Sequence, residues 1–402
     1  MNPRFPTRRA VMLTAAALCL VAPHGAEAAD PPGVTATEIK LGQTMPYSGP
    51  ASSYGTIGKV EQAYFKMLNE QGGVNGRKID LISLDDGYSP PKTVEQTRKL
   101  VEREGVLLIF DPLGTAPNSA IQKYLNDKKV PQLFISSGSS RFNDPKRFPW
   151  TMPWLPSYEA EAYDFGTYIL KNKPSAKIAI LYQNDDIGKD YIHGVERALG
   201  DKARKMIVAK ASYEVTDPTV ESQIVSLQGS GADTLVSVAT PKFAAQAIRK
   251  IHDIGWKPLH LTSDVGSSIG AVLKPAGVEK AVGMITGAYV RDPTDPATQA
   301  TEGYKNWLAF MKQYFPEGDT TDLNNVIGYS IAQTLVHTLK QCGNDLSREN
   351  VMRQAASLHD LVLPMVMPGL VINTSPTDYQ PLKSVRLMRF DGEHWVLLEG
   401  KS

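Results

Sequence analysis

The sequence contains little cysteine and no excess of charge of either sign. Its 402 residues include two cysteines, Cys19 and Cys342, and carry a net charge of +1. If a segment containing Cys19 is removed on export, no intrachain disulfide can form. The balanced charge also lacks the clustered Lys and Arg that nucleic-acid binding requires. We therefore expect a protein stabilised by its hydrophobic core, with no nucleic-acid partner.

Sequence signatures of common chemistries are equally scarce. There is no P-loop, no complete glycine motif for dinucleotide binding and no H-E-x-x-H zinc motif, and the seven histidines are scattered. We therefore expect no metal, no cofactor and no catalytic residues. One stretch, 266–270, fits the G-x-S-x-G pattern of serine hydrolases, with His359 or His394 as a candidate base. An exported serine hydrolase using Ser268 is the alternative function of a different class.

Long hydrophobic runs are absent after the N-terminus. There, three arginines precede the apolar run AVMLTAAALCLVA, and Ala26-Glu27-Ala28 follows it. This order is typical of a cleavable secretory signal peptide, and the run is shorter than the roughly 20 residues of a membrane span. We predict a signal peptide over 1–28 and a soluble protein exported to the periplasm. The Arg8-Arg9 pair leaves both the general secretory and the twin-arginine routes open.

Short apolar segments alternate with helical patterns along most of the chain. After the first segment, apolar residues from Val60 to Leu68 are spaced i, i+3, i+4, i+7 and i+8, which predicts a helix with one buried face. The predicted strands are 38–45, 78–84, 105–110 and 131–136, then 177–184, 206–213, 233–239 and 259–263. Alternation of this kind indicates parallel sheets covered on both faces. We predict two similar α/β lobes, each with a mainly parallel sheet flanked by helices.

The alternation stops after residue 290. Helical patterns follow over 299–314, 324–342 and 348–357. The end of the chain alternates apolar and polar residues about Phe390-Asp391-Gly392-Glu393, which predicts a β-hairpin over 384–399.

Polar loops rich in small residues follow several predicted strands. They cover 48–55, 113–116, 136–140 and 263–266. In open α/β sheets ligands bind beyond the carboxyl ends of the strands, where helix N-termini offer N–H groups to a carboxylate. The alternative explanation for each loop alone is a helix N-cap. Their recurrence in both lobes favours a small-molecule cleft.

Several stretches together resemble one family. They are IKLGQTMPYSGPASSYG, NEQGGVNGRKIDLISLDDGYSPPKTVEQTRKLV, LGTAPNSAIQKYL, YQNDDIGKDY and NNVIGYSIAQTLVHTL. Their order and spacing resemble the periplasmic branched-chain amino-acid-type (Leu/Ile/Val) binding proteins, the solute receptors of ABC importers. The resemblance implies the type I fold, in which three crossover segments join two lobes and the ligand lies between them. It implies lobes of 33–153 plus 291–362 and 154–290 plus 363–402. It also implies a monomer whose partner is an inner-membrane ABC permease.

The resemblance also assigns site residues, position by position. Tyr54 matches the family's aromatic residue of the first loop, and Asp264 matches an acidic residue that pairs with a ligand ammonium. The loops that hold a ligand carboxylate match Thr115, Ala116, Ser137, Gly138 and Ser139. These matches imply a small carboxylate ligand, such as a branched-chain or related amino acid.

Two departures from the family pattern widen the choice of ligand. Ile187 and Thr240-Pro241 stand where the family commonly has aromatic residues, whereas Trp154 and Tyr158 are available at the first crossover. An aromatic carboxylic acid stacked on tyrosine or tryptophan is therefore the alternative ligand. If Asp264 faces the cleft unpaired, it argues against this ligand, because a buried carboxylate without a partner is costly and favours a cationic group. The alternative role of Asp264 is a cap for the following helix.

Overall fold

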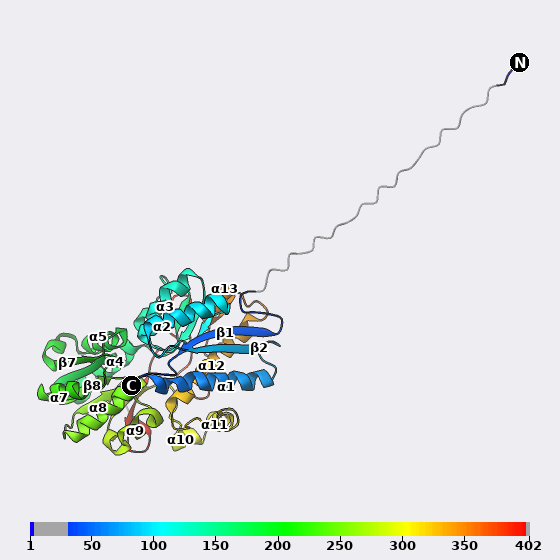
Figure 1. Cartoon of the computed structure of the whole chain (residues 1–402). Helices are drawn as coiled ribbons and strands as arrows, with labels where there is room; N and C mark the ends of the chain where they lie inside the picture. The colour runs from blue at the N-terminus through cyan, green and yellow to red at the C-terminus, as the bar shows by residue number, and fades with distance from the viewer. Residues whose placement is uncertain (4–30, 399–402) are drawn as a thin grey trace. The chain divides into compact units, whose positions relative to one another are not determined.

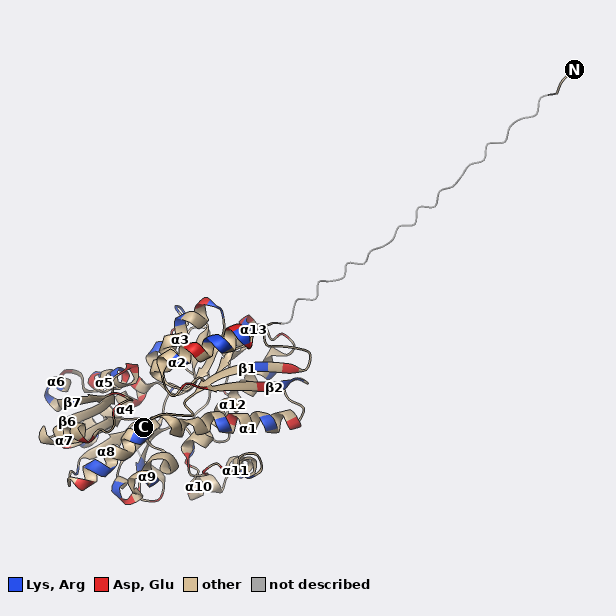
Figure 2. Cartoon of the chain, viewed as in Figure 1, with Lys and Arg blue, Asp and Glu red and all other residues tan. Residues whose placement is uncertain are grey.

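The structure is a computed structural model that describes residues 1–3 and 31–398. The predicted signal peptide, 1–28, lies outside the described residues except for the first three. Residues 31–398 belong to one unit of structure, in which two sheets have helices on both faces (Figure 1). Basic and acidic residues are interspersed along the helices (Figure 2), as the balanced composition implies.

The first lobe is built on a five-stranded parallel sheet with the order β2-β1-β3-β4-β5. Its strands are β1 (Glu38–Met45), β2 (Lys78–Asp85), β3 (Ile109–Phe110), β4 (Gln132–Ile135) and β5 (Thr151–Pro153). β1 and β2 pair in register along their whole length, so that their last residues lie side by side. The loops that follow the two strands therefore begin at the same edge of the sheet.

Helices cover both faces of this sheet. They are α1 (Gly55–Glu70), α2 (Pro90–Arg98) and α3 (Thr115–Asp127). The predicted stripe of α1 is confirmed, since Val60 and Leu68 are buried in the main core. α2 and α3 cover the opposite face, where Ile109 of β3 packs with Ile121 and Leu125 of α3.

The second lobe is built on a seven-stranded sheet with the order β12-β11-β10-β9-β8-β6-β7. Its strands are β6 (Ile178–Gln183), β7 (Ile207–Tyr213), β8 (Thr234–Val238), β9 (Leu259–Thr262), β10 (Ile285–Ala288), β11 (Arg386–Phe390) and β12 (Trp395–Leu397). Only the pairings of β11 are antiparallel, and β11 with β12 forms the predicted hairpin. Each face of this sheet packs against a different hydrophobic core, because successive strand residues face opposite sides. Along β6, Ile178 and Ile180 belong to one core, and Ala179 and Leu181 belong to the second.

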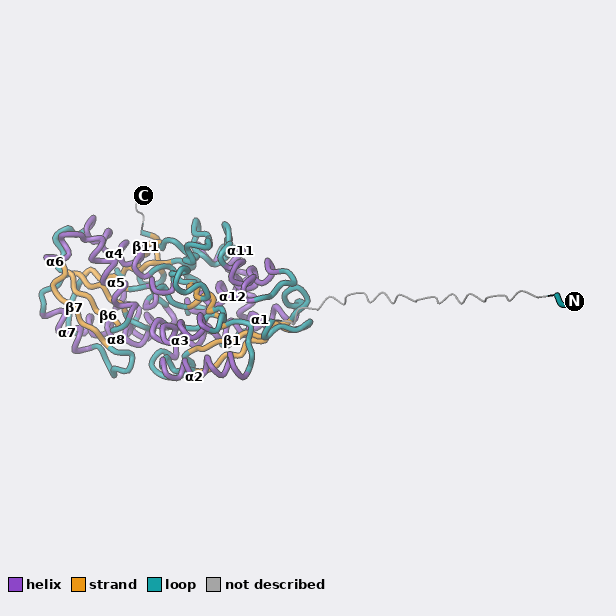
Figure 3. Tube along the Cα trace, turned by 90° about the horizontal axis from the view of Figure 1, so that it is seen from above, coloured by secondary structure: helices purple, strands orange, loops and turns teal. Residues whose placement is uncertain are grey.

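The helices of the second lobe lie on both sides of its sheet (Figure 3). They are α4 (Tyr158–Asn172), α5 (Asp186–Leu199), α6 (Ala203–Met206), α7 (Glu221–Gly229), α8 (Pro241–Asp253) and α9 (Lys274–Ala276). α4 and α5 approach closely at Gly194, where a Cβ atom would lie 2.4 Å from the carbonyl oxygen of Glu159.

The late helices return to the first lobe. They are α10 (Pro296–Gln299), α11 (Glu302–Tyr314), α12 (Leu323–Cys342) and α13 (Arg348–Ala355). α12 lies against α1 (Figure 1), and Arg348 of α13 donates to the carbonyl oxygens of Val106 and Leu107. The chain thus passes between the lobes three times: between β5 and α4, between β10 and α10, and between α13 and β11. The predicted fold class is confirmed, and the predicted lobe boundaries stay a prediction.

Some predicted elements differ in extent. The strand predicted over 105–110 is reduced to β3, although Leu107 still donates to the carbonyl of Lys40 in β1. β5 and β10 were not predicted, because a three-residue strand and a glycine-containing strand have little periodicity to detect. None of the described helices is long and apolar enough to cross a bilayer.

Candidate functional site

A cavity lies between the two lobes at the carboxyl ends of their strands. Its empty volume, including space open to solvent, is about 600 Å³. The first-lobe wall comes from the loops after β1, β2, β3 and β4 together with the start of α12. The second-lobe wall comes from the loops after β5, β6, β8, β9 and β10. The predicted cleft beyond the strand ends is therefore present as a cavity.

Most of the cavity lining is aromatic or aliphatic. Its apolar and aromatic side chains are Tyr54, Ile57, Tyr88, Leu113, Leu155, Tyr158, Ile187, Val265, Tyr289, Leu323 and Ile327. The Tyr54 hydroxyl donates to the carbonyl oxygen of Val265 at 3.0 Å and so joins the two walls. Burial raises the pKa of Tyr54 well above its ordinary value, so this hydroxyl stays protonated and remains a donor. The lining suits a ligand with a substantial apolar part.

Tyr88 is held in a strained backbone conformation at the cavity wall. Its φ of 60° lies in the left-handed region, which costs a non-glycine residue energy and is concentrated at ligand sites. Its ring packs against Gly114, where an added Cβ atom would lie 2.4 Å from the ring. The side-chain amide of Gln183, from the second lobe, approaches the Tyr88 hydroxyl at 3.4 Å. Gly114 therefore allows the tyrosine to sit at the junction of the two lobes.

The N-terminus of α3 supplies a polar part of the first-lobe wall. Gly114 is its N-cap and has no side chain to cap the first turn. The N–H of Thr115 is directed to the Tyr88 hydroxyl, and the N-cap residue makes no side-chain bond to the first turn, at the positive end of the helix dipole. The Thr115 hydroxyl lies 2.8 Å from the hydroxyl of Ser137 and lines the cavity. N–H groups and hydroxyls in this arrangement suit a carboxylate.

Asp264 supplies an acidic group on the opposite wall. It begins a short 3₁₀ turn after β9 (Asp264–Gly266), lines the cavity and is 8% exposed. Burial raises the pKa of Asp264 to about 6. The hydroxyl of Tyr191 contacts its Oδ1 at 3.2 Å, and buried Glu161 lies directly behind it, bonded to the Asp264 backbone N–H. The cavity thus has an apolar body, a polar helix end and an acidic group.

The comparisons with known proteins agree with this geometry. A sequence model described as periplasmic binding protein matches residues 38–394. The chain belongs to the periplasmic binding protein family. Members of this family are extracytoplasmic substrate-binding receptors that bind small molecules and work with ABC permeases. The family to which this periplasmic binding protein belongs is a family of receptors and not of enzymes.

Relatives of this periplasmic binding protein are similar over most of its length. Leu/Ile/Val-binding protein homolog 1 of Brucella abortus is 22% identical over 316 residues, covering 78% of this chain and 81% of the relative. A substrate-binding periplasmic protein from Ralstonia solanacearum superposes with a TM-score of 0.80 at 23% identity, covering 90% of this chain and 100% of that one. A branched-chain amino-acid transporter protein from Thermus thermophilus with bound valine has a TM-score of 0.80 at 17% identity, covering 90% and 96%. At these identities the structures show the shared fold.

Five of the ten predicted site residues line the cavity. They are Tyr54, Thr115, Tyr158, Ile187 and Asp264. The other five are not part of its lining: Ala116, Ser137, Gly138, Ser139 and Trp154. Contact of any of these residues with ligand stays a prediction.

Ser137 and Gly138 support residues of the wall from behind. Ser137 bonds the Thr115 hydroxyl and accepts from the Ser139 N–H at 3.3 Å. Gly138 accepts from the Tyr158 N–H at 3.0 Å, and an added Cβ atom there would lie 1.9 Å from the Pro156 oxygen.

Trp154 lies in the first crossover and not against the cavity. Its indole N–H donates to the hydroxyl of Thr334 in α12 at 2.9 Å, and its ring meets Tyr289 edge to face. Trp154, which the sequence suggested as a ligand contact, therefore holds Tyr289 in place, and Tyr289 lines the cavity.

Sequence reasoning missed several cavity residues. Tyr88 had a detectable signal, since it follows a predicted strand, whereas Tyr289 follows β10, which was not predicted. Asn324 and Ile327 belong to a helix far away in the sequence, and Glu161 is one polar residue of an ordinary helix. No local pattern distinguishes these last three residues.

Ser268 caps a helical turn and bridges the lobes. Its hydroxyl donates to Asp322 at 2.8 Å and accepts from the N–H groups of Ala271 and Leu323. Within the described residues no histidine lines the cavity, and of the two candidate bases His359 is exposed and His394 lies by Asp391 at 3.6 Å. The geometry assigns Ser268 a capping role.

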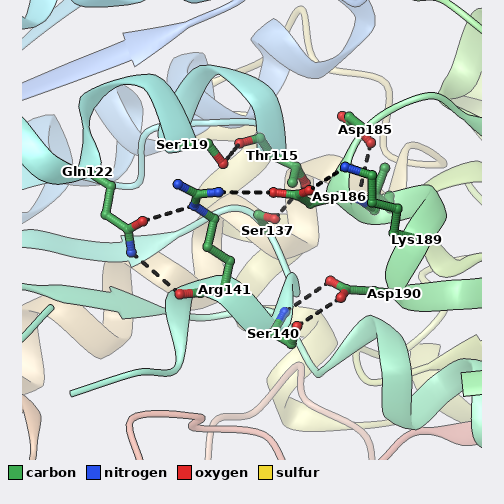
Figure 4. Close-up of polar contacts among 11 residues, drawn as sticks. Thr115, Ser119, Gln122, Ser137, Ser140, Arg141, Asp185, Asp186, Lys189 and Asp190 are labelled. Carbon is green, nitrogen blue, oxygen red and sulfur yellow. Dashed lines mark hydrogen bonds and ion pairs between the residues drawn. The ribbon is translucent and has the colours of Figure 1, made fainter. Parts of the chain in front are cut away.

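A second set of contacts joins the lobes beside the cavity (Figure 4). Asp190 of α5 accepts from the N–H of Ser140 at 3.0 Å and from its hydroxyl at 2.8 Å. Arg141 pairs with Asp186 of α5 at 3.3 Å and donates to Gln122 of α3 at 3.0 Å. We call Ser140, Arg141, Asp186 and Asp190 the latch. It holds the loop after β4 against α5.

Proposed function

We propose that this chain is the solute receptor of an ABC importer and that it captures a small amino acid, of branched-chain or related type, in the interlobe cavity. The observation that carries the proposal is the pairing of an uncapped helix N-terminus at Thr115 with buried Asp264 in one apolar cavity. A ligand carboxylate fits the helix end, and a ligand ammonium neutralises the buried acid. The apolar body of the cavity takes the side chain.

Closure of the lobes is the proposed mechanism of capture. The bond from Tyr54 to Val265, the latch and the bond from Ser268 to Asp322 join residues of opposite lobes around the cavity. A ligand that touches both walls binds the closed arrangement better than an open one, and so shifts the population toward it. The closed receptor then delivers the solute to an inner-membrane permease, acting as a monomer in the periplasm. N-terminal sequencing of exported protein tests the removal of residues 1–28, with Ala29 as the expected first residue.

An aromatic carboxylic acid is the second candidate ligand. Four tyrosines in the lining support it, and such an acid would bind if Asp264 holds a proton and carries no charge. Relatives differ in ligand, since one protein of the same fold is described as a fatty acid transporter component from Thermomonospora curvata, with a TM-score of 0.76 at 22% identity, covering 92% of this chain and 93% of that one.

Matched ligand pairs separate these candidates in a thermal-shift experiment. Leucine is compared with 4-methylpentanoate, and phenylalanine with 3-phenylpropanoate, so that each pair differs only in the ammonium group. Ligand at about 100 times its dissociation constant adds about 2.7 kcal/mol to the unfolding free energy. We expect the amino acid of at least one pair to raise the melting temperature and its partner to fail. Shifts with the acids alone would favour the second candidate, and no shift with any of the four compounds or with decanoate would contradict carboxylate binding.

A further inference from the structure

Glu161 is a buried acid that lies behind the cavity wall. It stands one turn after Tyr158 on α4 and is 2% exposed. Its Oε1 accepts from the backbone N–H of Asp264 at 3.0 Å and from that of Gly287 at 3.1 Å. These bonds fasten the Asp264 turn and β10 to α4. They also occupy Oε1 as an acceptor.

The contacts of Tyr191 with Glu161 and Asp264 limit how many protons these three side chains can hold. Its hydroxyl hydrogen-bonds to Oε2 of Glu161 and contacts Oδ1 of Asp264 at 3.2 Å. One hydroxyl has one hydrogen, so it cannot donate to two carboxylates at once. A proton on one of the two acids resolves the count; on Oε2 of Glu161, it lets Glu161 donate to Tyr191 and Tyr191 donate to Asp264.

Direct contact of the two acids also requires one proton between them. The carboxyl groups of Glu161 and Asp264 are close enough to hydrogen-bond to each other. Two carboxylates in such contact repel, whereas one carboxyl and one carboxylate attract. In either arrangement one acid donates and the other accepts; Asp264 lines the cavity, where a ligand cation can reach it, whereas Glu161 is 2% exposed and lies behind the wall, which favours Glu161 as the donor.

The surroundings supply no positive charge to offset a second carboxylate. Among the ion pairs of the described residues, none includes Glu161 or Asp264. The titratable groups that face the pair are tyrosines: Tyr54, Tyr158, Tyr191 and Tyr289. Burial, and then the charge of Asp264, raise the pKa of Glu161 well above its ordinary value.

We propose that Glu161 is a specificity-determining residue that stays protonated as a neutral donor, so that the pair presents one negative charge and selects a ligand with one ammonium group. This inference rests on the proposed function and deepens it. A ligand without a cationic group leaves Asp264 unpaired, and a dication leaves one of its charges unpaired. Protonation of Asp264 below about pH 6 removes the remaining charge, so affinity for an ammonium ligand falls as the pH drops below that value.

Substitution by glutamine tests the proposal, because an amide keeps one acceptor and one donor and cannot ionise. Leucine and phenylalanine are the probes, measured by calorimetry. At pH 7.5 we expect Glu161→Gln to bind within about threefold of the unmodified protein and Asp264→Asn to bind about 10- to 100-fold more weakly. Glu159→Gln, two residues away on α4, is the matched control and should bind normally. Equal losses in Glu161→Gln and Asp264→Asn would overturn the proposal.

Infrared spectroscopy of the ligand-free protein gives an independent measurement. A protonated carboxyl group has a C=O stretch that is absent from a carboxylate. We expect this band to lose intensity at pH 7.5 in Glu161→Gln and to be unchanged in Glu159→Gln. A band that is equally strong in Glu161→Gln would overturn the inference even if amino acids bind. If the proposed function itself is wrong, the result is different: the unmodified protein then binds neither leucine nor phenylalanine.

Calorimetry in two buffers of different ionisation enthalpy measures how many protons are released when the ligand binds. Because Asp264 is neutral in the free protein at pH 5 and ionised when it holds an ammonium, binding should release protons at pH 5 and almost none at pH 8. Proton release that does not depend on pH would contradict the proposal that Glu161 and Asp264 together carry one negative charge.

Discussion

The hydroxyl of Tyr54 donates to the backbone carbonyl of Val265 at 3.0 Å, across the cavity between the two lobes. The two residues are 211 positions apart in the sequence. Tyr54 stands at the start of α1 in the first lobe, and Val265 belongs to the turn after β9 in the second. A single side chain therefore serves as cavity wall and as a bond between the lobes.

Removal of this hydroxyl should weaken ligand binding more than it weakens folding. Tyr54→Phe keeps the ring in the cavity and loses one hydrogen bond of about 0.5–1.5 kcal/mol, which corresponds to about a two- to tenfold loss of affinity. Calorimetry with the best amino acid of the screen measures the change. Tyr64→Phe is the control, since Tyr64 lies on the same helix against Phe310 and Tyr329. Equal affinity of Tyr54→Phe and the unmodified protein would show that the bond does not contribute to closure.

The latch should contribute to closure in a similar way. Asp190→Ala removes both bonds to Ser140, so we expect about a two- to tenfold loss of affinity and a smaller closed population. A pair of fluorophores, one on each lobe, reports closure on addition of ligand. Asp201→Ala, at an exposed position of the same lobe, should behave like the unmodified protein. The prediction is wrong if the two variants close equally well.

Ser268 should matter for stability and not for chemistry. Ser268→Ala removes an N-cap and the bond to Asp322, so the unfolding free energy should fall by about 1–2 kcal/mol. Denaturant unfolding measures this loss, with Ser222→Ala on exposed α7 as the control. A serine-directed fluorophosphonate should not label the folded, unmodified protein. Labelling that disappears in Ser268→Ala would support the hydrolase alternative.

A second buried acid pair should make the stability depend on pH. Glu61 and Asp111 are fully buried and close enough to interact directly, and Asp111 also accepts from Ser136 of the cavity wall. Burial, and then the charge of Asp111, raise the pKa of Glu61 well above its ordinary value, and burial raises that of Asp111 to about 7. A raised carboxyl pKa stabilises the fold below the unfolded value, near 4, and this contribution is lost as the pH rises through the folded value.

The unfolding free energy should therefore decline between about pH 4 and pH 7 and beyond. Glu61→Gln keeps a neutral donor toward Asp111 and removes the cost of keeping Glu61 protonated. We expect this variant to be more stable than the unmodified protein at pH 8, by at least about 1 kcal/mol, and to differ less at pH 5. Urea unfolding at the two values tests this, with exposed Glu95→Gln as the control. A Glu61→Gln variant that is less stable at pH 8 would contradict the shared proton.

Much of the fold follows from local patterns. The apolar stripe from Val60 to Leu68, the alternating strands and the final hairpin were all predictable, because helix and strand periodicities are visible within ten or so residues. The loops that line the cavity were predictable as a group, since ligands of open α/β sheets lie beyond the strand ends. β10 was not predictable, because its pairing with β11 joins segments about a hundred residues apart.

The individual side chains of the site were predictable only in part. Tyr54, Thr115 and Asp264 follow strands and do line the cavity. Trp154 also follows a strand, yet its indole turns to Thr334 of α12. Which way such a side chain faces depends on the helix that packs against it.

Periodicity and turn chemistry were thus enough for two α/β lobes, a cleft at their strand ends and a family resemblance that the family match confirms. Tertiary structure alone decided that Glu161 lies behind Asp264, that Tyr191 touches both acids, and that the start of α12 closes the cavity. The reason is physical. Periodicity reports which face of an element is buried, whereas the sharing of a proton depends on ångström-scale distances between side chains from different elements.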